Sequence, residues 1–329
     1  MKKLLAFLFF LALGFFFFIT LFSTIDLKEV WNTLQKLSLF EASVVFLLTA
    51  VFIYVGAVKW HTILRRQGNN IPVFQLWKIY LASFAISFFA PMVVFGAEVF
   101  RGYTLRERHD VPFAKGMATV IIDRILETTS YLVIITAGTL VFFLWGTPFS
   151  LQTGVIIAAA LVVVGLLLAF FYLRMFRGES IVRIFIRHPT GNHIVDVEDE
   201  ISRFFHWKDS AVWIALSLSL LKSAVGLVRV WVLMVFLSKT IVFLPAITVL
   251  GFYYLALLIP IPAALGSHDA LQALAFQSFG LGGASVGVAF AFVIRAVEAM
   301  FALVGIALFV HSGLGLLTTF IAEKVSRKS

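Results

Sequence analysis

Two short charged motifs lie inside apolar stretches of this 329-residue chain. Arg124 precedes Glu127 by three positions, and Arg295 precedes Glu298 by the same interval. Residues three or four apart share one face of a helix, which also brings Asp123 near Glu127. Charges at membrane depth are costly and usually functional. The two motifs therefore predict either ion pairs that lock helices together or part of a binding site.

Arginine side chains in such a setting suit an anionic ligand. A guanidinium group can donate two parallel hydrogen bonds to phosphate oxygens, and nearby helix ends add partial positive charge. The candidate phosphate-binding residues are Arg101, Arg124, Arg295 and Lys222. Residues that could hold these cations in place or take up protons are Glu98, Asp123, Glu127, His268, Asp269 and Glu298. Lys59 is instead interpreted as a boundary lysine, whose aliphatic part lies in the apolar zone while its ammonium reaches the polar membrane surface.

Several other chemistries have no support in the sequence. The chain has no cysteine, which removes disulfides and thiolate metal ligands. It also lacks the phosphate-binding loop of ATPases, the paired histidines of zinc proteases and the nucleophile turn of serine hydrolases. We therefore expect no metal, no cofactor and no catalytic residue.

The composition indicates a polytopic, all-α membrane protein. Hydrophobic residues make up 61% of the chain and charged residues only 13%, with a mean hydropathy of +1.02. Soluble domains have roughly a quarter of their residues charged. The net charge of +9 fits basic cytoplasmic loops and contacts with anionic lipids, but no basic soluble module for nucleic acid. We expect multi-pass insertion in the cell (inner or cytoplasmic) membrane.

Hydropathy and basic loops predict six membrane spans. They cover residues 4–22, 42–58, 114–144, 153–172, 211–237 and 284–310. The first apolar run exceeds the roughly 7–15 residues of a signal-peptide core and is interpreted as a retained span. Residues 23–41 are expected to hold a helix in the outer interface, and the acidic run at 196–200 to lie solvated on the cytoplasmic side. Both termini are predicted to be cytoplasmic.

Two further apolar stretches predict re-entrant hairpins. Residues 71–100 and 242–276 are too short for two crossings, which need about 40 residues. A single crossing of the first stretch would place clusters of arginine outside. Turn-forming residues interrupt both stretches, namely Pro91 and Gly96 in the first and Pro260, Pro262 and Gly266 in the second. Each hairpin is therefore predicted to enter the membrane, turn and leave by the same side.

The two halves of the chain match at a nearly constant offset of 170 or 171 residues. Gly56, Gly96, Gly116 and Arg124 correspond to Gly226, Gly266, Gly287 and Arg295. The first hairpin is predicted to open to the cytoplasm and the second to the outside, so the repeats are inverted, as in alternating-access carriers. The expected single membrane domain comprises a first span with an interfacial helix (1–41), repeat A (42–145), a span with a cytoplasmic connector (146–210), repeat B (211–312) and a tail (313–329).

Four motifs of this chain also occur, in the same order along the sequence, in one protein family. Pro91 with the later run Gly96-Ala97-Glu98-Val99-Phe100-Arg101 resembles a P-x-R-x-G-E-x-x-R signature. Residues 121–127 resemble an E-R-x-x-D helix, residues 259–269 a P-x-P-x-G-L-G-x-R-E turn, and Lys59-Trp60 with Leu64 an R-W-x-x-L-L motif. By these motifs the chain resembles the lysylphosphatidylglycerol synthase transmembrane (flippase-like) family over essentially its whole length.

The resemblance implies translocation (flipping) of an anionic phospholipid or a polyprenyl-phosphate-linked lipid between leaflets by alternating access. The family pattern has arginine and glutamate where this chain has His268 and Asp269, and glycine where it has Ala264. The preferred headgroup is therefore expected to differ from an aminoacylated phosphatidylglycerol. The 329 residues contain no stretch that resembles the family's soluble aminoacyl-transferase domain, so we do not expect lipid aminoacylation from them.

Two other functions fit the same residues. A membrane-embedded enzyme could modify a lipid in this site, and a non-catalytic protein could present lipids to a lipid synthase or glycosyltransferase. Membrane lipids are the expected partners in all three cases. Product formation from a labelled lipid would favour the enzyme, whereas dependence on a second protein would favour presentation.

Overall fold

The computed structural model describes residues 27–89, 91, 96–146, 151–177, 179, 192–206, 209–259 and 261–326. The expected span at 4–22 and the expected turn residue Pro260 lie outside the described residues. Every regular element in these ranges is helical, which confirms the all-α fold class. The helices are α2 (Leu27–Gln35), α3 (Leu39–Arg66), α4 (Val73–Phe89), α5 (Gly96–His109), α6 (Phe113–Trp145), α7 (Leu151–Phe176), α9 (Asn192–Phe204), α10 (Ser210–Ser238), α11 (Leu244–Leu258), the 3-10 helix η1 (Pro262–Ala264), α12 (Ser267–Ser278) and α13 (Gly283–Ser326).

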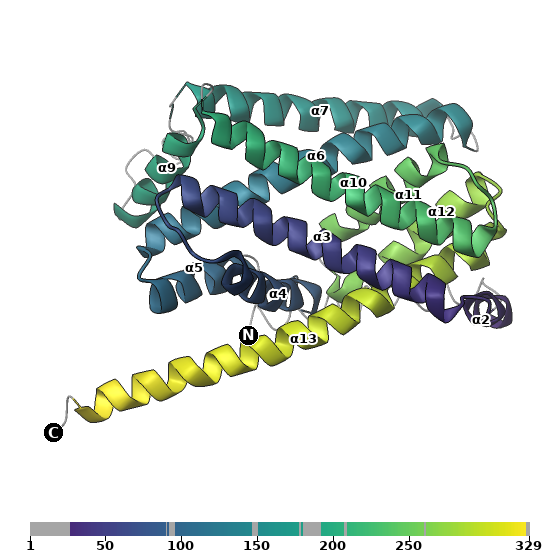
Figure 1. Ribbon diagram of the computed structural model, residues 1–329. Coiled ribbons are helices and arrows are strands. Elements are labelled where there is room, and N and C mark those ends of the chain that lie inside the picture. Colours follow the sequence, from purple (N-terminus) through teal and green to yellow (C-terminus); the bar gives the residue numbers. More distant parts are fainter. Residues whose placement is uncertain are drawn as a thin grey trace, which may run out of the picture.

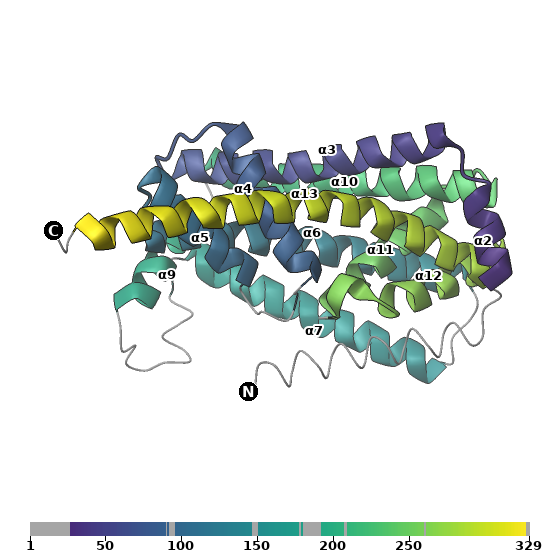
Figure 2. The same ribbon diagram turned by 90° about the horizontal axis from the view of Figure 1, so that it is seen from below.

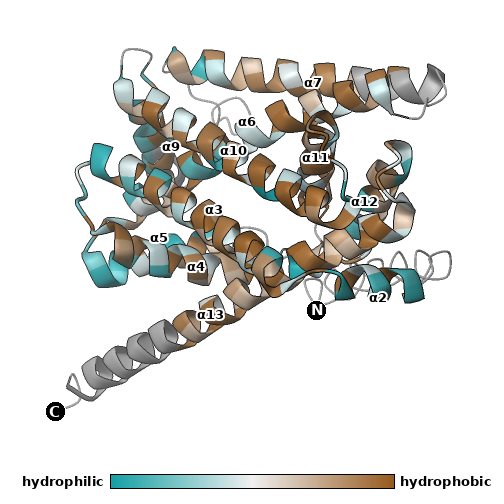
Figure 3. Ribbon diagram, turned by 45° about the vertical axis from the view of Figure 1, so that its right-hand side comes forward, coloured by the Kyte–Doolittle hydropathy of each residue, from teal (hydrophilic) through white to brown (hydrophobic). Residues whose placement is uncertain are grey.

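Five of these helices are long and apolar enough to cross a membrane. They are α3, α6 and α10 over their full lengths, Ala159–Phe176 of α7 and Gly283–Val310 of α13. They coincide with five of the six predicted spans, and the sixth is the one outside the described residues. Figure 3 shows hydrophobic residues along these helices and hydrophilic residues gathered on α2, α5 and α9. The chain is therefore a multi-pass membrane protein.

Helices α3 and α10 lie side by side and are tied together at both ends (Figure 1). A capping box begins α3, because Glu41 and Ser38 each accept a hydrogen bond from the other's backbone N–H. Glu41 also pairs with Lys239, which follows the last residue of α10, at 3.1 Å. At the opposite end, Arg66 lies 2.6 Å from Asp209, the N-cap of α10. Burial acts to raise the pKa of Asp209, but hydrogen bonds from the Ala211 N–H and from Arg66 outweigh it and hold that pKa below its usual range.

Two shorter apolar helices, α4 and α11, cross the long helices in matching ways. Helix α4 packs on α13, and α11 packs on α6 (Figure 2). A glycine allows each close approach: a Cβ on Gly305 would lie 2.3 Å from the Leu81 carbonyl oxygen, and one on Gly138 would lie 2.7 Å from the Ile247 carbonyl oxygen. Each short helix is followed by a second arm, α5 or α12, which packs on α6 or α13 respectively. Helix α6 therefore packs against α5 and α11, and α13 packs against α4 and α12. Each long helix thus contacts one helix of the pair α4–α5 and one of the pair α11–α12.

The glycine at the α4–α13 crossing gives a direct test of this packing. We expect Gly305→Ala to lower the free energy of unfolding by about 1–3 kcal/mol, because the new methyl group must displace the α4 backbone. Thermal unfolding of the purified protein in detergent measures the change. Gly165→Ala on α7 is the matched control, since its Cβ would meet no atom within 4 Å. Equal unfolding temperatures for the two variants would contradict this account of the crossing.

One short helix agrees with its prediction, and two others differ in detail. The predicted helix within 23–41 is confirmed as α2, and its Val30 and Thr33 are buried where it packs on α13. Helix α5 ends at His109, nine residues past the predicted end at residue 100. It continues because polar residues such as Arg101 and Thr104 are buried against neighbouring helices. The acidic run on α9 is only partly solvated, since Glu198 is buried.

Candidate functional site

A cavity of about 850 Å³ is lined by residues of α3–α7 and α10–α13. Its apolar wall includes Phe52, Phe84, Leu167 and Leu257, which come from α3, α4, α7 and α11. Ionisable side chains from α5, α6, α10, α12 and α13 also line it: Glu98, Arg101, Arg124, Glu127, Lys222, His268, Arg295 and Glu298. Eight of the ten predicted site residues therefore surround one space that joins apolar and charged surfaces. The other two, Asp123 and Asp269, pair with arginines that line it.

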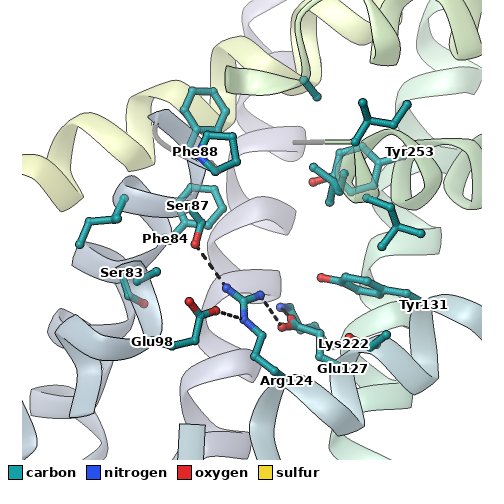
Figure 4. Close-up of a pocket in the computed structure, with 18 of the residues that line it drawn as sticks. Ser83, Phe84, Ser87, Phe88, Glu98, Arg124, Glu127, Tyr131, Lys222 and Tyr253 are labelled. Atoms are coloured by element: carbon teal, nitrogen blue, oxygen red, sulfur yellow. Dashed lines mark hydrogen bonds and ion pairs between the residues drawn. The ribbon is translucent and has the colours of Figure 1, made fainter. Parts of the chain in front are cut away.

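Arg124 connects α6 to both arms of the first helical pair (Figure 4). Its Nε lies 2.6 Å from Glu98 Oε1 on α5, and its Nη2 donates to Ser87 Oγ on α4 at 3.3 Å. Its Nη1 lies 3.2 Å from Glu127 Oε2, so the predicted intrahelical pair is present. The Arg124 side chain is nevertheless 41% exposed, whereas Glu127 is almost fully buried. Arg124 thus offers a guanidinium surface to whatever enters the cavity.

Lys222 brings a second cation to the same carboxylate. Its Nζ contacts Glu127 Oε1 and donates a hydrogen bond to the Tyr80 hydroxyl at 3.0 Å. The Phe52 ring lies 4.6 Å from the same ammonium. Because Lys222 is buried midway along α10, these contacts join α10 to α4 and α6. They also compensate the cost of placing an ammonium in apolar surroundings.

The third cation on this side, Arg101, belongs to a buried triad. Asp123 Oδ2 lies 2.9 Å from Arg101 Nη1, and Asp123 Oδ1 lies 2.9 Å from Lys59 Nζ. The Trp60 ring packs 4.0 Å from the Arg101 guanidinium carbon. The prediction that Lys59 extends to the membrane boundary is therefore wrong, because Asp123 offers a buried partner within reach and Lys59 is 0% exposed. Within the described part of the chain, Arg101 Nε and Nη2 are buried with no hydrogen-bond partner.

On the other side of the cavity, the predicted Arg295–Glu298 pair is replaced by two different pairs. Arg295 contacts Asp269 of α12, and Glu298 accepts from Arg229 at 2.9 Å and from the Tyr253 hydroxyl at 2.7 Å. Asp269 lies close because its Oδ2 caps the turn by accepting from the Gly266 N–H at 3.0 Å. Spacing along α13 places Arg295 and Glu298 near one face, but partners on other helices determine the pairs.

His268 occupies the first turn of α12 beside this group. It is buried, and the Tyr253 ring lies 5.2 Å from the imidazole in an edge-to-face arrangement. Its Nε2 has no hydrogen-bond partner among the described residues, although the side chain lines the cavity. No group of His and carboxylate residues in the described ranges could hold a metal ion.

The predicted turn residues lie where the helical pairs reverse. Pro91 lines the cavity after α4, and Gly96 begins α5. In the second pair, Pro262 begins η1 and Gly266 precedes α12 with φ 77°. Ala263 and Ala264 are also left-handed, with φ 51° and 50°. Such a conformation costs an alanine roughly 1–2 kcal/mol relative to glycine.

This strain predicts a stabilising substitution. We expect Ala264→Gly to raise the free energy of unfolding by about 1 kcal/mol, since glycine adopts positive φ freely. Ala256→Gly, in the helical interior of α11, is the control and should lower the stability by a similar amount. Thermal unfolding of both variants measures these changes. A loss of stability in Ala264→Gly would contradict the strain inferred at Ala264.

Other residues of the site lay outside the predicted set. Lys59 and Arg229 had a detectable signal, because they occupy matching positions in the two halves. Tyr80 and Tyr253 had none, since an aromatic residue in an apolar helix has the same pattern whether it packs or donates a hydrogen bond. Their roles depend on contacts between helices far apart in sequence.

Comparison with known proteins agrees with this architecture. The family described as the lysylphosphatidylglycerol synthase TM region matches residues 3–305. A relative named UPF0104 membrane protein MJ1595, from Methanocaldococcus jannaschii, is 20% identical over 294 residues, which cover 82% of this chain and 84% of the relative. Because the family match spans most of the sequence, the chain belongs to the lysylphosphatidylglycerol synthase transmembrane family.

Proposed function

We propose, starting from this family membership and the geometry of the cavity, that the protein moves an anionic lipid between membrane leaflets. The proposal rests on one observation: a basic surface and an apolar surface line the same cavity. Four basic side chains, Arg101, Arg124, Lys222 and Arg295, line the same cavity as the apolar residues of α3, α4, α7 and α11. A phosphate headgroup suits the first surface, and acyl or prenyl chains suit the second.

The basic residues would have different roles in binding. Arg124 is the most exposed of them and would contact the phosphate first. Arg101 has two buried nitrogens without partners, Nε and Nη2, and would donate hydrogen bonds from them to a phosphate oxygen. Glu98 and Glu127 would hold Arg124 in place before the lipid arrives.

An inverted repeat would give such a site access to each leaflet in turn. We propose repeat A within residues 42–145 and repeat B within 211–312. The packing supports this division, because α4 on α13 corresponds to α11 on α6, and α5 on α6 corresponds to α12 on α13. The glycines at matching crossings also correspond, as Gly116 meets α5 and Gly287 meets α12. Two-fold related halves around a central site are the usual build of alternating-access carriers.

The membrane orientation follows from the basic residues. Arg65 and Arg66 end α3, and Arg106 and Arg108 end α5. Positive residues gather on the cytoplasmic side, so these helix ends would be cytoplasmic in the cell membrane. The pair α4–α5 would then be a re-entrant hairpin that opens to the cytoplasm, and α11–α12 one that opens outside.

Reconstitution of the purified protein tests the proposal. Liposomes would carry a trace of fluorescent phosphatidylglycerol, and dithionite added outside would bleach the outer leaflet only. We expect the protected fraction to decay faster in proteoliposomes than in protein-free vesicles. No acceleration by the protein alone would count against transport. If acceleration needed an added lipid synthase or glycosyltransferase, lipid presentation would replace transport as the function.

A further inference from the structure

The lysine, arginine and carboxylate side chains around the cavity divide into two sets with different net charge. The first set, which we call the cationic side, has the basic residues Lys59, Arg101, Arg124 and Lys222 and the carboxylates Glu98, Asp123 and Glu127. The second set, which we call the neutral side, has Arg229 paired with Glu298 and Arg295 paired with Asp269. Four cations against three carboxylates leave one positive charge on the cationic side. Two cations against two carboxylates leave none on the neutral side.

The surplus positive charge belongs to the triad around Asp123. Lys59 and Arg101 share this single carboxylate, whereas the other basic residues of both sides have at least one carboxylate each. A buried, uncompensated charge is costly, and an anion that binds nearby would remove that cost. One surplus charge matches the single negative charge of a phosphodiester.

The neutral side carries unused hydrogen-bonding groups without surplus charge. Arg295 Nε and Nη1 and His268 Nε2 are buried and, among the described residues, have no partner. The two arginine nitrogens are donors that need acceptors, and the imidazole nitrogen donates or accepts according to its tautomer. Because Asp269 already compensates Arg295, neutral oxygens such as hydroxyl groups satisfy these nitrogens without leaving a charge unbalanced.

The two sides face one another across the cavity. Figure 4 shows Glu98 and Arg124 on one side and Tyr253 on the other. The His268 ring lies 5.2 Å from that of Tyr253, so the imidazole belongs to the Tyr253 side. Because all four residues line the same cavity, a headgroup that spans it would place its phosphate at Arg124 and Arg101 and its distal atoms near His268 and Arg295.

We propose that His268 and Arg295 form a separate subsite that binds the hydroxyl groups of a lipid headgroup. The substrate class is then a singly charged phosphodiester lipid whose headgroup is a polyol or a sugar. A headgroup with an ammonium does not fit this side, because Asp269 and Glu298 are each engaged by an arginine. A second phosphate does not fit either, since no surplus positive charge would balance it. The inference rests on the proposed function.

Two lipids that differ only in headgroup hydroxyls test this subsite. Dioleoyl phosphatidylglycerol and dioleoyl phosphatidylethanol each carry one negative charge, but only the first has hydroxyl groups. Native mass spectrometry of the full-length protein in detergent gives the affinity for each lipid. We expect about tenfold tighter binding of phosphatidylglycerol, the size of one or two buried hydrogen bonds.

Substitutions at His268 then identify the nitrogen responsible. His268→Leu should reduce binding of phosphatidylglycerol to the level of phosphatidylethanol and leave phosphatidylethanol unchanged. His268→Gln should keep the preference, because its amide nitrogen can occupy the position of Nε2. His268→Asn should lose it, since its shorter side chain reproduces Nδ1 instead. His206→Leu, at an exposed histidine after α9, is the matched control and should have no effect.

The outcomes separate this inference from the function on which it rests. Equal affinities of the unmodified protein for the two lipids, or equal losses for both lipids in His268→Leu, would overturn the hydroxyl subsite alone. The proposed function fails instead if neither lipid binds more tightly than dioleoyl phosphatidylcholine. A preference that persists in both His268→Leu and Arg295→Gln would also overturn the subsite, because it would place hydroxyl recognition elsewhere.

Discussion

Arg124→Gln should slow the exchange of phosphatidylglycerol between leaflets by about tenfold to a hundredfold, the kinetic equivalent of losing one charged hydrogen bond. Arg124 is the basic residue of the cavity with the most exposed side chain, and it holds both arms of the first helical pair through Ser87 and Glu98. Its loss would remove both a phosphate ligand and a contact between helices. The dithionite assay in proteoliposomes measures the rate. Arg66→Gln, at the exposed end of α3, is the control and should exchange lipid normally.

A double variant separates phosphate binding from a purely structural pairing. If Arg124 acts only by neutralising Glu98, then Arg124→Gln combined with Glu98→Gln should recover exchange, because no unpaired charge is left. If Arg124 binds the phosphate, the double variant should stay as slow as Arg124→Gln. Arg124→Lys should give an intermediate rate, since lysine keeps the charge but loses the planar, two-pronged donor. Recovery in the double variant would refute the role proposed for Arg124.

The fold class was predictable because membrane spans leave a strong signal. Long apolar runs between polar segments predicted five helices that the structure contains, and proline with glycine indicated where the shorter pairs reverse. Helix α5 was less predictable. Its later residues are polar and lie beyond residue 100, where the predicted hairpin ends, but Arg101 and Thr104 are buried against other helices. Tertiary partners, rather than hydropathy, therefore decide where this helix ends.

The membership of the site was easier to predict than its pairings. Charge inside apolar sequence is rare enough to identify Arg101, Arg124, Lys222 and Arg295, all of which line the cavity. The choice of partner depends on how helices cross, which spacing along one helix does not contain. Glu298 pairs with Arg229 of α10 rather than with Arg295 of its own helix. Lys59 was misassigned for the same reason, because its partner lies on α6.

The largest effect on stability is expected at Asp123. Asp123→Asn should lower the free energy of unfolding by about 3–5 kcal/mol, because it leaves Lys59 and Arg101 buried together without a counter-charge. That is a large fraction of the roughly 5–15 kcal/mol by which folded proteins are usually stable. Yield of folded protein after size-exclusion chromatography and the thermal unfolding temperature both measure it. Asp199→Asn, at an exposed carboxylate of α9, is the control and should change neither.

A substitution of Lys59 tests why Asp123→Asn should lose stability. The proposed cause is that Lys59 and Arg101 share the Asp123 carboxylate as their counter-charge. Lys59→Met should cost much less than Asp123→Asn, since Asp123 then still pairs with Arg101 and no ion is left alone. Adding Lys59→Met to Asp123→Asn should recover part of the lost stability, because it removes one of the two stranded cations. The expected coupling is about 0.5–3 kcal/mol, as for residues in one ion-pair network. Additive losses in the double variant would mean that Lys59 and Asp123 contribute independently. The surplus positive charge assigned to the cationic side would then lose its structural basis.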